Sequence, residues 1–187
     1  EQGEVHIARA AYNVKFPARF QLVAAMNPCP CGYLLDPVMT CRCTIAQVQR
    51  YQARLSGPLL DRIGIRLLVN PPDHAQIFAS NDIAADKVSD SLRASVSRAR
   101  ALQQQRQGCA NADIAVDKLM AVIKMSAKAQ ALRDKIASDL KLSARSCHQL
   151  MRVARTIADL DSRDLVEVGH LHETYTLIKP NKAGIFS

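Results

Sequence analysis

The chain changes character at Pro71-Pro72, and this change constrains its fold more than any other feature. Before the two prolines, short apolar runs alternate with proline, glycine and cysteine. After them, glycine nearly disappears, and alanine, leucine, arginine, lysine and glutamine dominate. The first composition is typical of short strands and turns, and the second is typical of helices. We therefore expect an α/β part over 1–72, a linker over 73–84, an all-helical domain over 85–178 and a tail over 179–187 without an assigned role.

The first part contains two candidate strands and one candidate hairpin. The run "FQLVAAM" at 20–26 is apolar throughout and lies between two prolines, which predicts a buried strand of a parallel sheet. A second strand is predicted for "IRLLV" at 65–69. Near the start, "GEVHIARA" alternates, with Val5 and Ile7 on one face, and this pattern indicates one arm of a hairpin.

Capping residues predict short helices between the two candidate strands. Thr44 is suited to cap a helix through "IAQVQRYQARL", and Ser56-Gly57-Pro58 ends that helix. The sequence "PLLDRI" then forms a short helical turn with Pro58 at its start.

The second part is predicted to consist of helices with apolar stripes. The longest ends near Gly108, and its stripe repeats every three or four residues: Val88, Leu92, Val96, Ala99 and Leu102. Shorter helices are predicted over 114–125 and 127–141. Ser143 is suited to cap the next helix, whose stripe is Leu150, Val153, Ile157 and Leu160. Ser162 is expected to cap a last helix over "DLVEVGHLHETYTLI".

The charge balance favours a polyanionic partner. The formal net charge is +8 and the sequence pI is about 9.4, which favours nucleic acid first and nucleotide phosphates second. The alternative is a soluble protein whose basic surface has no polyanionic partner. No stretch approaches the roughly 20 apolar residues of a membrane span, so no membrane association is expected.

Cysteine usage predicts a cytoplasmic location. The chain has six cysteines and no secretory signal, and clustered cysteines in a reducing compartment bind metal more often than they pair as disulfides. The start, "EQGEVHIARA", does not begin with Met, and we interpret it as part of a longer polypeptide. Cys109 and Cys147 stand alone and are expected to be small buried thiols.

Four of the cysteines form a candidate metal site. Cys29, Cys31, Cys41 and Cys43 follow the pattern C-x-C-x9-C-x-C. Four thiolates make a complete tetrahedral shell for Zn²⁺, which would clamp a loop with little apolar content. The spacing differs from the C-x2-C of common zinc sites. Another metal, no metal and a redox disulfide are therefore the alternatives.

Three polar residues are candidates for contact with a phosphate. Asn27 directly follows the first candidate strand, where ligands of open α/β sheets bind, although Asn-Pro is also a common start of a turn. Arg62 precedes the second candidate strand, and an arginine can stabilise charge on a transferring phosphoryl group. Arg145 lies in the first turn of a predicted helix, against the helix dipole, and could share an anion with that helix end. Each arginine could equally be a solvated surface residue.

The sequence lacks a G-x-x-x-x-G-K-[ST] phosphate loop and an apolar strand that ends in paired carboxylates. We therefore expect that this chain alone is not a complete nucleotide hydrolase. His148, His170 and His172 fall in helical patterns, and we interpret them as surface or packing residues.

Four motifs in order resemble one protein family. "FPARFQLVAAMNPCPCGY", "CRC", "YQARLSGPLLDRI" and "SARSCHQLMRVARTIADLD" resemble the C-terminal part of bacterial magnesium-chelatase-like AAA+ ATPases of the ComM (YifB) type, and the resemblance covers roughly 1–175. It implies a partial AAA+ α/β core followed by an all-α lid, in a ring of six subunits that binds ATP and Mg²⁺ between subunits. The phosphate loop, the magnesium-binding acids and a Lon-protease-like domain would precede this chain.

The resemblance also implies roles for single residues. Asn27 matches sensor 1, Arg62 the arginine finger that reaches the neighbouring subunit, and Arg145 the sensor 2 arginine of the lid. "EQGEVHIARA" resembles a hairpin that projects a basic residue into the ring channel of related helicases, and Arg9 is at that position. ComM proteins are helicases for branch migration during natural transformation, so the implied partner is single-stranded or branched DNA.

This chain departs from the family pattern at two places. Gly64 stands where the family has an acid after the finger, so any ion pair of that acid is lost. The tail from Lys179 does not match the usual family ending. Two other functions remain open: the ATPase motor of a metal chelatase, and a non-catalytic, zinc-stabilised module that binds nucleic acid.

Overall fold

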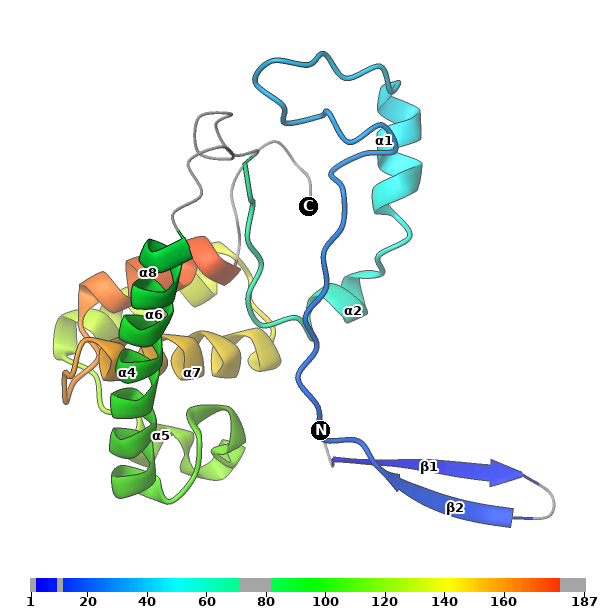
Figure 1. Cartoon of the computed structure of the whole chain (residues 1–187). Coiled ribbons are helices and arrows are strands. Elements are labelled where there is room, and N and C mark those ends of the chain that lie inside the picture. Colours follow the sequence, from blue (N-terminus) through cyan, green and yellow to red (C-terminus); the bar gives the residue numbers. More distant parts are fainter. Residues whose placement is uncertain (1–2, 10–11, 71–81, 179–187) are drawn as a thin grey trace.

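The computed structural model describes residues 3–9, 12–70 and 82–178, with side chains of the last range from Lys87 onward. A hairpin, an extended region with two short helices and a group of packed helices follow one another along the chain (Figure 1). The predicted tail and most of the predicted linker lie outside the described residues. Within the described residues, no helix is long and apolar enough to cross a membrane.

The predicted hairpin is confirmed. Strands β1 (Glu4–Arg9) and β2 (Tyr12–Pro17) pair antiparallel, in a register that runs from Glu4 opposite Pro17 to Arg9 opposite Tyr12. Alternation puts the apolar side chains on one face: Val5, Ile7, Val14 and Phe16. Every residue of both strands is exposed, and the hairpin projects away from the helices (Figure 1).

The two predicted core strands are not formed in this structure. Segments 20–26 and 65–69 run extended but belong to no sheet (Figure 1). All of 20–26 is exposed, and Val23 keeps 85% of its surface in solvent. A buried parallel strand needs neighbours on both edges and cover on both faces, and the described residues offer only the β1–β2 pair as a sheet.

The helices between these segments form at the predicted caps. Helix α1 (Ile45–Gln52) starts with a reciprocal cap, because Thr44 Oγ1 accepts from Gln47 N at 3.3 Å and Thr44 N donates to Gln47 Oε1 at 2.9 Å. Helix α2 (Gly57–Leu60) follows with Ser56 as its N-cap and Pro58 in its first turn.

The long helix α4 (Asp82–Gln107) is confirmed, but its predicted stripe is only partly buried. The helix ends at Gly108, whose φ of 73° provides the left-handed turn of a helix C-terminus. Ala99 is buried at 3% exposure, whereas Val88, Leu92 and Val96 are each more than half exposed. Only the C-terminal half of the stripe therefore lies in the interface with the next long helix.

Two other helix predictions need correction. The segment predicted as one helix over 114–125 contains a 3₁₀ turn, Val116–Lys118, and helix α5 (Leu119–Val122), and another 3₁₀ turn, Asn111–Asp113, precedes it. Ile114 has an extended ψ of 124°, which breaks the helix and carries its side chain into the core. Ser162 has a φ of 54° and caps no helix, because α8 (Val168–Ile178) begins six residues later.

The core is centred on α7 (Ala144–Leu160), which begins after its predicted cap Ser143 and packs against α4 and α8. Helix α6 (Ala127–Asp139) packs against α8 and completes the group. A parallel bridge between Met125 and Val166 ties the start of α6 to the α7–α8 loop. The buried cluster is made mostly of aliphatic residues, among them Leu119, Ala129, Leu150, Ala154, Val166 and Leu171.

Candidate functional site

The four clustered cysteines meet in space. The Sγ atom of Cys29 lies 3.4 Å from that of Cys31 and 3.7 Å from that of Cys41, and those of Cys31 and Cys41 lie 3.6 Å apart. With Cys43, all four sulfur atoms lie within 4.8 Å of one another, and all four are free thiols. Cys29 is fully buried, so the cluster has an inner side that is closed to solvent.

Two turns and one helix fold the loop back on itself. Gly32 adopts a φ of 86° and donates to Cys29 O at 3.1 Å, which reverses the chain after the first cysteine pair. Asp36 Oδ1 accepts from Val38 N at 2.8 Å and from Met39 N at 2.7 Å and closes the second turn. The end of α1 is tied to the start of the loop, because Gln52 Nε2 donates to Pro28 O at 3.2 Å.

The electrostatics of the cluster suit a bound cation. Backbone N–H groups of Tyr33 and Arg42 lower the pKa of Cys31 to about 6. Burial, together with the Cys31 thiol, raises the pKa of Cys43 to about 12. A thiolate at Cys31 therefore makes ionisation of the neighbouring thiols less favourable. A bound dication would offset the repulsion between the negatively charged sulfur atoms. A tetrahedral Zn²⁺ shell with bonds of about 2.3 Å needs sulfur atoms roughly 3.8 Å apart. The observed spacings are close to this value.

Asn27 lies next to the cysteine loop. A Cβ atom on Gly32 would lie 3.8 Å from Asn27 Nδ2, so the amide lies over the backbone of the first turn. The side chain of Asn27 is otherwise exposed. The structure therefore brings the candidate sensor residue and the thiol cluster together.

The other candidate residues lie on separate elements. Arg62 follows α2, is exposed, and its Nη1 donates to Pro58 O at 3.4 Å. Arg145 is the second residue of α7 and is half-buried. Arg9 ends β1, opposite Tyr12, and is exposed. Their roles in phosphate or DNA contact stay predictions.

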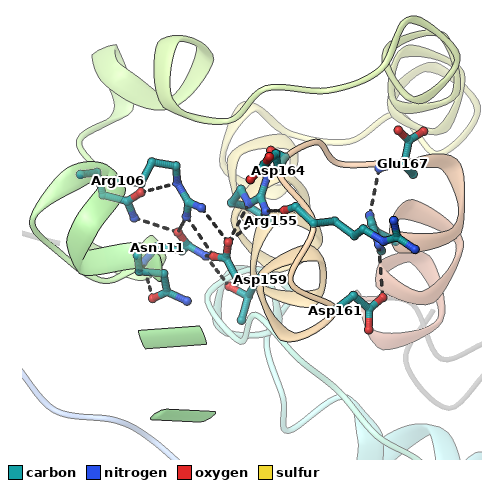
Figure 2. A network of polar contacts seen from close by, with 12 residues as sticks. Arg106, Asn111, Arg155, Asp159, Asp161, Asp164 and Glu167 are labelled. Carbon is teal, nitrogen blue, oxygen red and sulfur yellow. Dashed lines mark hydrogen bonds and ion pairs between the residues drawn. The ribbon is translucent and has the colours of Figure 1, made fainter. Parts of the chain in front are cut away.

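The sequence did not reveal a buried polar hub in the helical part. Asp159 is almost fully buried and accepts five hydrogen bonds or ion-pair contacts around its two oxygens, which are shown in Figure 2. Arg106 contributes two of them, at 2.6 and 2.9 Å. Asn111 Nδ2 donates at 2.8 Å, and Arg155 donates through Nε at 3.1 Å and lies at 2.9 Å through Nη2. Burial opposes ionisation of Asp159, but bonds from Arg106 and Asn111 hold its pKa below the ordinary value.

The same hub fixes the loop between α7 and α8. Arg155 Nη1 donates to Asp164 O at 2.6 Å, and Nη2 donates to Arg163 O. His170 Nδ1 accepts from Glu167 N at 2.9 Å, so this histidine is a packing residue, as predicted (Figure 2). The sequence signal for this buried hub is the i, i+4 spacing of Arg155 and Asp159. Ion pairs on the exposed face of a helix have the same spacing, so the signal does not identify a buried pair.

Comparison with known proteins gives two family matches and several relatives. The model described as magnesium chelatase, subunit ChlI, matches residues 1–77, and the model described as its C-terminal region matches 86–177. The chain is 36% identical over 173 residues to YifB of Escherichia coli and 37% identical over 173 residues to the competence protein ComM of Haemophilus influenzae. It is 38% identical over 169 residues to an uncharacterized protein of Mycobacterium tuberculosis.

These alignments cover 92%, 92% and 87% of this chain, respectively. They cover 33%, 33% and 32% of the relatives, so the chain spans about a third of the length of the curated relatives it matches.

Proposed function

The chain belongs to the magnesium-chelatase-like family, and we propose that it forms the sensor and lid region of an AAA+ ATPase that acts on DNA. The observation that carries the proposal is the similarity to the competence protein ComM along 92% of this chain. The motor would be a helicase for branch migration during natural transformation. The net charge of +8 supports a DNA partner, and six free cysteines suit a cytoplasmic location.

In the proposed reaction, ATP is hydrolysed between its β- and γ-phosphates with Mg²⁺ on the phosphates, in a ring of six subunits. Asn27 orients the attacking water. Arg62 stabilises the transition state in the neighbouring subunit, because its planar fork matches the charge on the transferring phosphoryl group. Arg145 contacts the γ-phosphate and couples the helical lid to the nucleotide state. Arg9, at the tip of the exposed hairpin, contacts DNA.

The proposal includes Zn²⁺ at Cys29, Cys31, Cys41 and Cys43. The sulfur spacing and the opposite pKa shifts of Cys31 and Cys43 support a tetrahedral dication site. A closed four-thiolate shell leaves no position for substrate, so the metal would be structural. Its effect on the reaction would be indirect, since it would hold the turn on which the amide of Asn27 lies.

A chimaera tests the function directly. This chain replaces the matching third of Haemophilus influenzae ComM, and ATP hydrolysis is measured with and without single-stranded DNA. We expect DNA-stimulated turnover that falls on the order of 10³-fold in Arg62→Ala, because the transition-state charge loses its partner. Arg50→Ala, an exposed arginine on α1, is the matched control and should keep full turnover.

The same assay separates the alternatives. The family description itself keeps a metal-chelatase motor as a second candidate, and turnover that ignores DNA would favour it. A non-catalytic module would bind DNA in a salt-dependent way without the rest of the ATPase. The isolated chain is expected to hydrolyse no ATP, and turnover by a clean preparation would contradict the predicted upstream position of the phosphate loop.

A further inference from the structure

Gly64 lies in close contact with helix α7. A Cβ atom on Gly64 would lie 2.0 Å from Nε2, 2.7 Å from Cδ and 3.3 Å from Cγ of Gln149. Heavy atoms do not approach this closely, so a side chain at this position would displace the end of the flexible Gln149 side chain. The absence of a side chain at Gly64 therefore allows the segment after Arg62 to lie directly against the lid.

Arg66 holds the same segment against helix α8. Its backbone N–H donates to Leu177 O at 2.8 Å, and its guanidinium donates to Ile178 O. The last carbonyls of a helix lack partners within the helix, and this end of the helix dipole favours a cation. Arg66 thus caps α8 from a position 112 residues earlier in the chain.

The arginine is sequestered at this contact. The Nε atom of Arg66 is buried without a hydrogen-bond partner among the described residues. Burial lowers the pKa of Arg66, and the carboxylate of Asp61 opposes that shift. The guanidinium donates to one carbonyl at the end of α8 and the backbone N–H of the same residue donates to the carbonyl before it, so Arg66 ties the segment to this helix end through two bonds.

This contact joins two candidate residues of the ATPase. Gly64 is two residues after Arg62, and Gln149 is four residues, or about one helical turn, after Arg145. We propose that Gly64, Arg66 and Gln149 form a joint that sets the position of Arg62 relative to the lid helices, which makes Gly64 and Arg66 positioning residues. The contact itself follows from the geometry, and its link to catalysis rests on the proposed function.

The joint predicts a specific pattern of loss and rescue. Gly64→Asp inserts a carboxylate where the end of the Gln149 side chain lies, so Gln149 must turn away, and we expect the contact between the segment and α7 to loosen. Gln149→Arg alone leaves the glycine in place and should be tolerated. The double variant Gly64→Asp/Gln149→Arg provides an ion pair across the same contact and should restore docking. Two positions that do not touch would show no such rescue.

Hydrogen exchange of the intact chain tests the contact. The amide of Arg66 is protected by its bond to Leu177 O, and we expect at least about tenfold faster exchange in Gly64→Asp and in Arg66→Ala, with recovery in the double variant. The amide of Ala154, in the buried part of α7, should exchange equally slowly in all variants and reports that the lid is folded. Unchanged exchange at Arg66 in Gly64→Asp, or a double variant without recovery, overturns the joint.

Kinetics of the chimaera test the positioning role. Gly64→Asp should lower kcat for ATP by about tenfold with little change in KM, because the finger acts on the transition state, and Gln149→Arg should restore kcat. If the variants change the amide exchange of Arg66 but leave kcat unchanged, the joint is a structural contact and the positioning role is contradicted. A chimaera with native Gly64 that shows no DNA-stimulated turnover contradicts the proposed function and leaves the exchange result in place.

Discussion

The region up to residue 70 and the helical domain from residue 82 onward contain similar apolar residues but expose them to very different degrees. Among the described residues before α4, Cys29 is the one hydrophobic side chain that is buried, while Phe20, Val23 and Val69 keep 77%, 85% and 86% of their surface exposed. In the helical domain, Leu119, Leu150 and Leu171 are each at most 2% exposed. The helical domain therefore holds a core of its own, whereas the first region is ordered by local caps and by the thiol cluster.

The difference teaches how each region obtains its stability. Burial of apolar surface gives roughly 25 cal/mol per Å², and the helical domain has this term available within its own sequence. In the first region, segments 20–26 and 65–69 belong to no sheet and several of their apolar side chains face water, so this region needs contacts beyond itself for further stability. The bonds from Arg66 to the end of α8 are one such contact, and the proposed Zn²⁺ would be another.

Metal removal should produce the largest effect, and it should destabilise the region up to residue 70 without affecting the helical domain. We expect one Zn²⁺ per chain by elemental analysis, and removal by a chelator should cost on the order of 10 kcal/mol of binding free energy. Hydrogen exchange should then rise across residues 28–55 and stay unchanged in α7. Cys31→Ser should lose the metal, and Cys109→Ser, outside the cluster, should keep it. A preparation without metal, in which all four thiols react rapidly, contradicts this prediction.

Removal of the Asp159 carboxylate should have the next largest effect, and it should act on the helical domain. Asp159→Ala leaves the buried Arg155 and the partly buried Arg106 without their counter-ion, which costs about 3–5 kcal/mol of unfolding free energy. Chemical denaturation measures this loss. Asp90→Ala is the control, since its pair with Arg93 is exposed and contributes at most about 1 kcal/mol.

The same carboxylate predicts a pH dependence. The pKa of Asp159 is lower in the folded state than its ordinary value of 3.8, so its contribution is fully present above that value. It is lost as the pH falls from 3.8 through the folded-state pKa, because the proton binds the unfolded state more tightly. Unfolding free energies measured between pH 6 and pH 2 should show this loss in the native chain and a flatter profile in Asp159→Ala.

A matched pair of apolar truncations sharpens the comparison between the regions. Leu171→Ala in the core should cost about 2–5 kcal/mol, because it removes buried methyl groups and leaves a cavity. Val23→Ala, at a side chain that is 85% exposed, should change stability by less than about 0.5 kcal/mol. Thermal unfolding of both variants gives the difference. A large loss in Val23→Ala would mean that the first region is buried in solution.

The smallest effect is expected at the cap of α1. Thr44→Ala removes the hydroxyl that accepts from Gln47 N and should destabilise the helix by about 1 kcal/mol. Thr44→Ser keeps an acceptor oxygen and serves as the control. Far-ultraviolet circular dichroism at increasing temperature compares the two variants, and equal profiles would show that the cap contributes nothing.

Elements that are set by a few adjacent residues were predicted correctly, whereas elements that depend on distant parts of the chain were not. The hairpin, the Thr44 and Ser143 caps and the end of the long helix at Gly108 each follow from a few adjacent residues. The strands over 20–26 and 65–69 depended on partner strands, which no local pattern supplies. The broken segment after Asn111 is set by Ile114, whose place in the core depends on distant helices.

The candidate site divides in the same way. The cysteine spacing predicted a cluster, and the turns at Gly32 and Asp36 form it locally. The roles of Arg9, Arg62 and Arg145 came from a resemblance and remain predictions. The joint at Gly64 was missed, because a glycine in place of an acid indicated only a lost ion pair, and Gln149 is an ordinary polar helix residue in the sequence.

The length of the exposed hairpin would amplify a rotation at its base. Its base is closed by the bond from Ala18 N to Gly3 O at 2.8 Å, and its six-residue strands carry the tip roughly 17 Å from that base. A rotation of about 10° at the base would move Arg9 by about 3 Å, close to the rise of about 3.4 Å per nucleotide along the axis of a DNA helix. In the proposed complex with DNA, a rotation of about 10° near Gly3 would thus correspond, by length alone, to the rise of about one nucleotide.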